Sequence, residues 1–356
     1  MPRTILITGG AGFIGSNLAE HLKTRGIADR VIALDNLRRR GVELNLARLR
    51  EAGVEFRHGD VRAETDLAPF RGRIDVLLEC SADPSVLAGY DGQVRYVVDT
   101  NLVGCVNCLE LARASDALFL FLSTSRVYPT QALRALRYEP RGRRFHLLDE
   151  QPMRGASGKG IAEDFPLSGA RTLYGTTKLA SELLIAEYVD MFGLRAVVNR
   201  CGVVSGPWQM GYAEQGVFAH WMVAHVFERP LSYIGFGGKG LQVRDVLHID
   251  DLADLIDIQL ERGGQPAGEV FNVGGGLANS ASLAEFTELC ERLTGNRLQI
   301  EPSPEVRAGD VPIYITDNEK VANHFGWRPR RNAEQTAADL CRWTETHADL
   351  LKAALL

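Results

Sequence analysis

Two residues in the middle of the chain have side chains and a spacing suited to proton transfer. Tyr174 and Lys178 lie four residues apart in "RTLYGTTKLASELL", a stretch with helical periodicity, so their side chains share one face of a helix. A free phenol titrates near 10 and is a weak base at neutral pH, but a neighbouring ammonium favours the phenolate. The pair therefore has the chemistry of an acid–base catalyst, although an ordinary helix with one polar pair explains the same spacing.

A glycine-rich stretch follows the first predicted strand. In "TILITGGAGFIGSNLAEHL", Gly9, Gly12 and Gly15 have the spacing G-x-x-G-x-x-G between an apolar strand and a helix. Such glycines let the strand turn tightly and let the backbone approach a pyrophosphate, which binds the free N–H groups of the helix N-terminus. This context favours a dinucleotide-binding turn over a glycine turn without a ligand.

Acidic residues at the ends of the next two predicted strands suit the adenosine half of a dinucleotide. Asp35 ends "RVIALD", about 20 residues after the glycines, where a carboxylate accepts hydrogen bonds from ribose hydroxyls. Asp35 favours NAD over NADP, whose phosphate it would repel, although arginines at 38–40 follow directly. Asp60 and Val61 lie at the expected edge of an adenine pocket, and a simple turn aspartate is the alternative for Asp60.

The elements that must position these residues alternate between apolar strands and helices. Strands are predicted at "TILIT", "RVIALD", "VEFRHGD", "IDVLLECSA", "ALFLFLSTS" and "LRAVVNRC", and helices include residues 101–115 and 174–192. This alternation predicts an α/β fold, a doubly wound parallel Rossmann sheet with helices on both faces. The predicted apolar stripe of the helix 174–192 comprises Leu179, Ala180, Leu183, Leu184 and Ala186.

The residue pattern changes after about residue 205, where glycine, proline and aromatic residues become frequent. We therefore expect an NAD-binding domain over residues 1–204 and a smaller C-terminal substrate-binding lobe over residues 205–356. Within the lobe, a segment at about residues 240–275 is expected to return to the first domain. Residues 130–170 form a long basic loop, of a length typical of lids or partly disordered segments.

Composition and charge exclude several classes of function. The chain has 356 residues, of which 45% are hydrophobic, and a formal net charge of −5 with both signs mixed. This is enough for a substantial core, and it lacks the basic footprint of nucleic-acid binding. No apolar run reaches transmembrane length and no secretory signal is seen, so we expect neither a nucleic-acid nor a membrane partner.

Cysteine and histidine usage points away from disulfide and metal chemistry. Six cysteines in a chain this long do not make a disulfide framework, and Cys105 and Cys108 fit a helix interior better than a zinc or redox pair. The scattered His220, His225 and His248 are expected to be structural. We therefore expect no metal site, and a reducing cytoplasm suits this chain.

Several motifs, taken in order, carry a family resemblance. The stretches "TGGAGFIG", "DNL", "GDVR", "STSRVY", "YGTTK", "RCGVVSGP" and "QVRDVLHIDDL" resemble the extended short-chain dehydrogenase/reductase superfamily over nearly the whole chain. Within it, "DNLRRRGVELNLARLR", "EQGVFAHWMVAHVFERP", "QVRDVLHIDDL" and "RAGDVPIYITDNEK" are most similar to nucleotide-sugar epimerases of the CDP-tyvelose (CDP-paratose) 2-epimerase type.

The resemblance implies bound NAD and a catalytic set of Thr124, Tyr174 and Lys178, with Lys178 also holding the nicotinamide ribose. Thr124 stands four residues before Tyr128, as the family pattern requires, and its neighbours at 123 and 125, both serines, are the alternatives. Asn101 matches a family asparagine near the active site with a structural role. The cofactor-binding residues implied are Gly9, Gly12, Phe13, Ile14, Gly15, Asp35, Asn36, Asp60, Val61, Asn101, Tyr174 and Lys178.

The residues after Thr124 bear on the type of reaction. Sugar 4,6-dehydratases that resemble this fold carry Asp-Glu where this chain has Ser125 and Arg126, and Arg126 also argues against a decarboxylase acting on UDP-glucuronate. The resemblance therefore implies oxidation, rotation and re-reduction of a nucleotide-diphosphate sugar, an epimerisation. The alternatives are a UDP-hexose 4-epimerase, another nucleotide-sugar-modifying dehydrogenase and a non-catalytic NAD-binding protein. The substrate-binding residues expected are Ser125, Arg126, Gln209, Gln215, Arg244 and Arg307.

Two departures from the family pattern lie around the expected sugar pocket. The segment "ECSA", beginning at Glu79, stands where the family often has "HLAA", and Pro129 replaces the usual glycine after Tyr128. Family members often dimerise through two helices of each subunit. The resemblance therefore implies a homodimer formed by the helices at 101–115 and 174–192.

Overall fold

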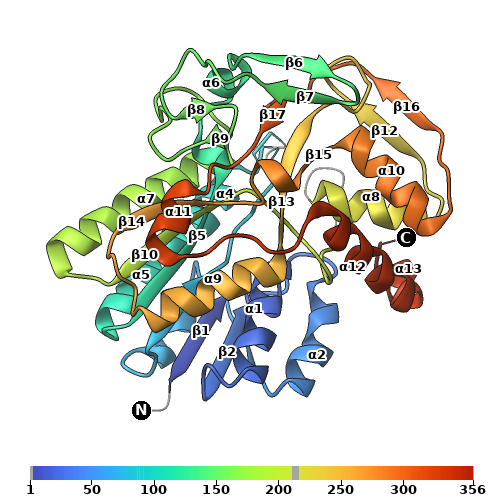
Figure 1. Cartoon of the computed structure of the whole chain (residues 1–356). Helices are drawn as coiled ribbons and strands as arrows, with labels where there is room; N and C mark the ends of the chain where they lie inside the picture. The colour runs from blue at the N-terminus through green and yellow to red at the C-terminus, as the bar shows by residue number, and fades with distance from the viewer. Residues whose placement is uncertain (1–2, 86, 88, 91, 211–215, 356) are drawn as a thin grey trace. The chain divides into compact units, whose positions relative to one another are not determined.

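The computed structural model describes residues 3–355 except 86, 88, 91 and 211–215 (Figure 1). The chain forms two compact units. The first comprises Met1–Thr124, Leu173–Arg200 and Ala253–Phe271, and the second comprises Ser125–Thr172, Cys201–Leu252 and Asn272–Leu356. The second unit is larger than the C-terminal lobe expected from the sequence, because it also contains Ser125–Thr172.

The first unit is built on a seven-stranded sheet in the order β14-β10-β5-β4-β1-β2-β3. Strand β1 pairs in parallel with β2 and β4, β2 with β3, and β4 with β5, which confirms the predicted doubly wound Rossmann sheet. Strand β5 has the apolar sequence "LFLFLST", and all seven of its residues are buried. A continuous apolar run of this kind is typical of a parallel strand that is covered on both faces. The strands are β1 Thr4–Thr8, β2 Arg30–Asp35, β3 Glu55–His58, β4 Val76–Glu79, β5 Leu118–Thr124, β10 Ala196–Cys201 and β14 Glu269–Val273.

Helices cover both faces of this sheet (Figure 1). On one face, α5 and α7 contribute Cys108, Leu109 and Ile185 to a core that includes Leu77 and Phe119 of the strands. On the other face α1 and α9 are joined by an ion pair between His21 and Asp257, with 2.8 Å between Nε2 and Oδ2. The helices are α1 Phe13–Thr24, α2 Asn45–Glu51, α3 Glu64–Leu67, α4 Val94–Val98, α5 Gly104–Ala114, α7 Leu173–Phe192 and α9 Ile249–Glu261.

The buried face of α7 differs from the predicted apolar stripe. Lys178, Ser181, Glu182 and Ile185 are buried, whereas Leu183 is 64% exposed. The prediction was wrong because periodicity counts a lysine and a glutamate as surface residues, while here both charges have buried ion-pair partners. The helix therefore turns its functional residues inward and leaves part of its apolar residues exposed.

The segment expected to be a long loop at 130–170 carries regular structure. Its short helix is followed by an antiparallel hairpin in which Tyr138 pairs with Leu147, and by a second in which Ala156 pairs with Ile161. Phe145 anchors the first hairpin, because it is buried in a core cluster. The elements here are α6 Thr130–Arg134, β6 Tyr138–Arg141, β7 Arg144–Leu147, β8 Ala156–Ser157 and β9 Gly160–Ile161.

The rest of the second unit combines short strands with helices packed around Phe218, Trp221 and Phe286. Strand β13 pairs in parallel with β11 and β17 and antiparallel with β15. No helix in the described part of the chain has both the length and the apolar character needed to cross a membrane. The elements are β11 Val203–Ser205, α8 Val217–Val226, β12 Leu231–Ile234, β13 Val243–His248, β15 Ser280–Ser282, α10 Leu283–Thr294, β16 Ile300–Ser303, β17 Ile313–Tyr314, α11 Glu319–Phe325, α12 Ala333–Thr346 and α13 Ala348–Leu355.

Candidate active site

The glycine-rich turn leads directly from β1 into α1. Gly9 has φ +63°, a conformation that favours glycine, and its carbonyl accepts a hydrogen bond from the Gly12 N–H at 3.0 Å. A Cβ on Gly15 would lie 2.2 Å from the Gly9 carbonyl oxygen, so the turn closes only with glycine there. Helix α1 begins at Phe13 with Gly12 as its N-cap. Gly12 has no side chain to cap the helix, so the first N–H groups fit a dinucleotide phosphate.

The turn follows β1, the strand at which the order of strands in the sheet reverses. Strand β1 has β2 on one side and β4 on the other, and the chain runs outward from β1 in both directions. Ligands of open α/β sheets bind outside the carboxyl ends of the strands at such a switch point. Thr8 and Glu79, the last residues of β1 and β4, lie opposite each other in the register.

The acidic residues predicted for the adenosine half are close to this turn. The Asp35 carboxylate accepts hydrogen bonds from the N–H groups of Ala11, at 3.1 Å, and Leu37, at 2.8 Å. Burial raises the pKa of Asp35, although these N–H groups oppose the rise. Asp35 is thus held beside the glycine turn, and its hydrogen bond to a ribose hydroxyl stays a prediction.

Asp60 and Asn36 form a second polar pair at the same edge of the sheet. The Asn36 amide donates to Asp60 Oδ2 at 2.9 Å, and Arg62 Nη2 donates to the same oxygen at 2.6 Å. The hydrogen bond from Arg62 lowers the pKa of Asp60 to about 2. Val61 is buried, and its carbonyl accepts from the Asn107 amide at 2.8 Å, which fixes this loop against α5.

Thr124 is the last residue of β5, and its side chain is almost fully buried. Of its two alternatives, Ser123 donates its hydroxyl hydrogen to Glu182 Oε1 at 2.5 Å. Glu182 in turn forms a buried ion pair with Arg200, at 2.7 Å from Oε2 to Nη2. The Ser123 hydroxyl therefore belongs to a buried structural network, while Ser125 begins the second unit.

Tyr174 and Lys178 lie in the first two turns of α7, as predicted from their spacing. Tyr174 is half-buried and Lys178 is 2% exposed. Burial opposes the charge of Lys178, but the carboxylate of Glu79 and the nearby phenol of Tyr174 raise the pKa of Lys178 above its ordinary value of 10.5. The ammonium therefore stays protonated beside the phenol, as the proposed acid–base pair requires.

Glu79 forms a buried ion pair with Lys178 that the sequence analysis did not predict. Its Oε2 lies 3.2 Å from Lys178 Nζ, and both side chains are 2% exposed. Ser81 donates its hydroxyl hydrogen to Glu79 Oε1. The signal in the sequence was the "ECSA" segment, but Glu79 and Lys178 are separated by 99 positions in the sequence, so no local pattern shows the pairing.

Asn101 connects the loop after β4 with α7. It lies in a π-helical turn, Asp99–Val103, that leads into α5. Its side-chain oxygen accepts from the Asp83 N–H at 2.7 Å, and its amide donates to Thr177 Oγ1 at 3.1 Å. These bonds tie the π-helical turn to the loop after β4 and to α7, and a contact of Asn101 with the cofactor stays a prediction.

Residues 5–274 match the sequence profile of the NAD dependent epimerase/dehydratase family. The chain belongs to this family. It is 30% identical to the CDP-paratose 2-epimerase of Salmonella typhi, over 96% of this chain and 99% of that protein. It is 29% identical to the UDP-glucuronate 4-epimerase of Thermodesulfobacterium geofontis, over 98% of each. The UDP-glucose 4-epimerase of Thermus thermophilus, solved in complex with NAD, is 26% identical with a TM-score of 0.77, over 96% of this chain and 99% of that one.

The family resemblance and the cofactor NAD expected from the sequence are thereby confirmed. The structure fits this cofactor, because a Cβ at Gly9 or Gly10 would lie under 3.0 Å from backbone atoms of Cys80 or Ala33. Only a backbone without side chains can pack there and still present its N–H groups to a pyrophosphate.

The second unit of this epimerase/dehydratase brings two of the three arginines predicted to bind the substrate to the segment 309–311. Arg126 Nη1 donates to the Gly309 carbonyl at 2.9 Å. Arg244 Nη2 lies 2.7 Å from Asp310 Oδ1 and donates to the Val311 carbonyl at 2.8 Å. Arg307 lies close by in the sequence, and its backbone carbonyl accepts a hydrogen bond from Arg134 Nη2 at 3.3 Å, while its charge acts on His220.

The other predicted substrate residues are placed differently. Gln209 is buried, and its amide oxygen accepts from Ser205 Oγ at 2.8 Å while its nitrogen donates to the Val204 carbonyl at 3.1 Å. Its amide thus supports the backbone of its own loop. Gln215 lies outside the described residues, and Ser125 begins a short 3₁₀ turn, Ser125–Val127.

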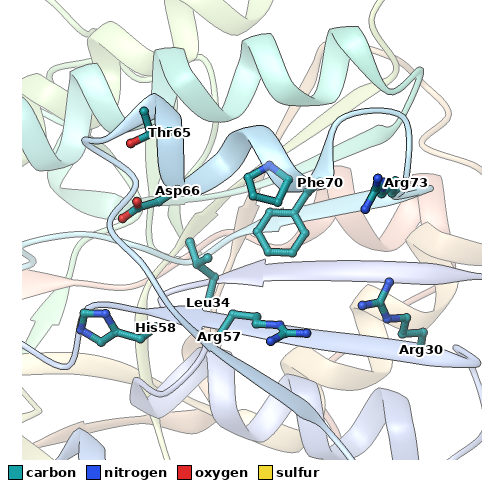
Figure 2. Close-up of a pocket in the computed structure, with 9 residues that line it drawn as sticks. Arg30, Leu34, Arg57, His58, Thr65, Asp66, Phe70 and Arg73 are labelled. Carbon is teal, nitrogen blue, oxygen red and sulfur yellow. The ribbon is translucent and has the colours of Figure 1, made fainter.

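A separate pocket lies against β2 and β3 (Figure 2). Figure 2 shows Phe70 and Leu34 near its centre, with arginines below and to the right and with His58, Asp66 and Thr65 on the left. The charges of Arg30 and Arg57 are compensated, because both form ion pairs with Glu55. None of the predicted site residues lines it. Its lining residues are Arg30, Leu34, Arg57, His58, Thr65, Asp66, Pro69, Phe70 and Arg73.

Proposed function

We propose that this protein is a nucleotide-sugar epimerase that inverts one carbon of the sugar by oxidation and re-reduction, with a substrate similar to that of the CDP-paratose 2-epimerases. The observation that carries the proposal is the buried, charged Lys178 one helical turn from Tyr174, in a chain whose family uses NAD. When bound, NAD supplies a hydride acceptor that also returns the hydride. The residues of the chain must then move one proton.

Tyr174 is the proposed base and acid. As the sugar C–H bond gives up its hydride, the phenolate takes the hydroxyl proton and the alcohol becomes a ketone. After the keto-sugar turns its other face, the same phenol returns the proton to the oxygen. In this proposal the Lys178 ammonium favours the phenolate, and the Thr124 hydroxyl, at the end of β5, hydrogen-bonds the reacting oxygen. The net change is inversion of one carbon.

The side chains after Thr124 support epimerisation over elimination of water. A dehydratase needs an additional acid and base to remove a hydroxyl group and a proton from neighbouring carbons. Here the next positions are Ser125 and Arg126, and Arg126 forms a hydrogen bond with the Gly309 carbonyl. Arg126 and Arg244, which both contact the segment 309–311, have guanidinium groups suited to the diphosphate of the substrate, and Arg307 is a third candidate.

The substrate class is tested by incubating the purified protein with CDP-, UDP-, GDP- and dTDP-sugars and following the sugar ring by NMR. We expect inversion at carbon 2 of a CDP-linked sugar. Inversion at carbon 4 of a UDP-hexose would identify the alternative epimerase, and a 4-keto-6-deoxy product would identify a dehydratase. If the protein retains NAD but converts none of these sugars, the non-catalytic alternative would be favoured.

A second measurement separates hydride return from enolisation. When the reaction runs in D₂O, a hydride that leaves and returns on NAD brings no deuterium into the sugar. We therefore expect a product without solvent deuterium at the inverted carbon. Deuterium at that carbon would contradict the oxidation and re-reduction mechanism, since it requires a carbanion that exchanges with water.

We further propose that the protein forms a homodimer through α5 and α7. These helices lie side by side (Figure 1), joined by a 2.6 Å hydrogen bond from Tyr188 to Glu110. Leu183 and Met191 of α7 are each 64% exposed, which leaves apolar surface for a second copy. We expect a dimer in sedimentation equilibrium that Leu183→Glu converts to monomer. Leu277→Glu, at an exposed leucine of the second unit, is the control. A wild-type monomer would contradict the proposal.

A further inference from the structure

Glu79 lies where the dinucleotide site and the proton-transfer site meet. It is the last residue of β4, and it stands opposite Thr8 at the end of β1 in the parallel register. The next residue, Cys80, contacts the cofactor turn so closely that a Cβ on Gly9 would lie 2.8 Å from the Cys80 carbonyl oxygen. A carboxylate at this switch point is therefore in the catalytic half of the unit, although the mechanism above gives it no part.

The Glu79 side chain is fixed from two sides and is almost inaccessible to water. Ser81 donates a hydrogen bond to Oε1, while Lys178 Nζ lies 3.2 Å from Oε2. The ammonium also lies 4.3 Å from the centre of the Phe121 ring, where a cation is attracted by the π face. These contacts define one position for the Lys178 ammonium, on the inner side of α7.

The carboxylate is needed to keep that ammonium charged. A lysine buried without a counter-ion loses its proton because the interior disfavours the charged form. Burial acts in this direction on the pKa of Lys178, and the charge of Glu79 is the largest of the influences that oppose it. Tyr174 on α7 and Cys105 on α5 also face the ammonium. Burial raises the pKa of Cys105 to about 12, so this thiol stays neutral at working pH.

A neutral Lys178 would not favour the phenolate of Tyr174. We propose that Glu79 is a positioning residue of the proton-transfer site, which fixes the Lys178 ammonium and keeps it charged so that Tyr174 can act as a base. Glu79 itself touches neither the sugar nor the reacting oxygen in this role. The consequence for catalysis rests on the proposed function, but the consequence for Lys178 does not.

The test follows the protonation of Lys178 by NMR in the full-length chain labelled with ¹³C at lysine Cε, with and without NAD. The Lys178 signal is identified by its loss in Lys178→Arg. In the wild type, we expect this signal to remain in the charged form up to pH 10.5. In Glu79→Gln the proton dissociation constant is expected to rise at least about tenfold. Glu79→Asp keeps the negative charge, so the wild-type behaviour should be largely restored.

A matched control is Glu182→Gln, which removes the carboxylate of the other buried ion pair of α7. It should leave the titration of Lys178 unchanged, because Glu182 pairs with Arg200. A Lys178 that titrates in Glu79→Gln as in the wild type would overturn the proposal. Loss of the Lys178 proton below pH 10.5 in the wild-type protein would also overturn the proposal. This measurement does not depend on whether any variant folds.

The pH dependence of turnover supplies a functional readout once a substrate is found. The turnover rate should rise with pH as the Tyr174 phenol loses its proton. We expect this rising part of the pH–rate profile to move to higher pH in Glu79→Gln, and to return towards the wild-type position in Glu79→Asp. If Glu79 had a purely structural role, its substitution would lower the amount of folded protein without moving this part of the pH–rate profile. If no nucleotide sugar is turned over, the proposed function fails, while the Lys178 titration still decides the role of Glu79.

Discussion

Replacing Tyr174 with phenylalanine is expected to lower turnover of the nucleotide sugar at least about a hundredfold, the lower end of what a positioned acid–base group contributes. The ring keeps its size, and only the hydroxyl that exchanges the proton is lost. The measurement is the steady-state rate of sugar inversion at saturating substrate, with the NAD content of each preparation determined after denaturation. The variant should retain its NAD, because the glycine turn and Asp35 are untouched.

Tyr188→Phe is the control for this substitution. Tyr188 lies on the same helix, but its hydroxyl hydrogen is donated to Glu110 on α5, away from the glycine turn. Its turnover is expected to stay close to that of the wild type. A Tyr174→Phe protein with wild-type turnover would exclude Tyr174 as the base and would leave Thr124 as the remaining candidate for proton transfer.

The second large effect is expected from Gly15→Ala, which should weaken NAD binding about ten- to a hundredfold. The new Cβ would lie 2.2 Å from the Gly9 carbonyl oxygen and 2.9 Å from the Gly10 Cα. These are backbone atoms that cannot rotate away, so the turn must open. Forced repacking of this kind costs about 1–3 kcal/mol, and each 1.4 kcal/mol is about tenfold in affinity. Calorimetric titration of NAD into cofactor-free protein measures the effect.

Gly26→Ala, just beyond the C-terminal end of α1, is the matched control. Gly26 follows α1 and has φ +68°, but a Cβ there has no atom within 4 Å. Alanine at this position strains the backbone by about 1–2 kcal/mol without touching the cofactor turn, so stability falls and NAD affinity stays. Equal NAD affinity in Gly15→Ala and the wild type would show that the turn does not contact the cofactor.

The sheet and the cofactor turn could be predicted from sequence because their signals are local. Short apolar runs, such as the three residues of β1 and the five of β5, have few alternatives to a buried strand, and the glycines at 9, 12 and 15 are needed by the backbone itself. The spacing of Tyr174 and Lys178 is also local. The short helix α4 and the π-helical turn Asp99–Val103 were not predicted, since neither has a distinctive periodicity.

What could not be predicted depends on tertiary partners. Lys178 and Glu182 are polar by type and buried in fact, because Glu79 and Arg200 compensate their charges from distant positions in the sequence. The same reason made the predicted apolar stripe of α7 wrong. The hydrogen bonds of the buried Gln209 amide to its own loop were also not predictable from its position in the sequence. Burial of a charge is decided by its partner, which no single segment contains.

The chain leaves and re-enters the first unit at the reactive side chains themselves. Thr124 is the last residue before the excursion 125–172, and Tyr174 is the second residue after it. The two hairpins between them can thus be exchanged as one cassette whose ends are already anchored by β5 and α7. Exchanging this segment between relatives would therefore leave the two residues of the proposed proton-transfer site in the first unit, while replacing a contiguous part of the second unit.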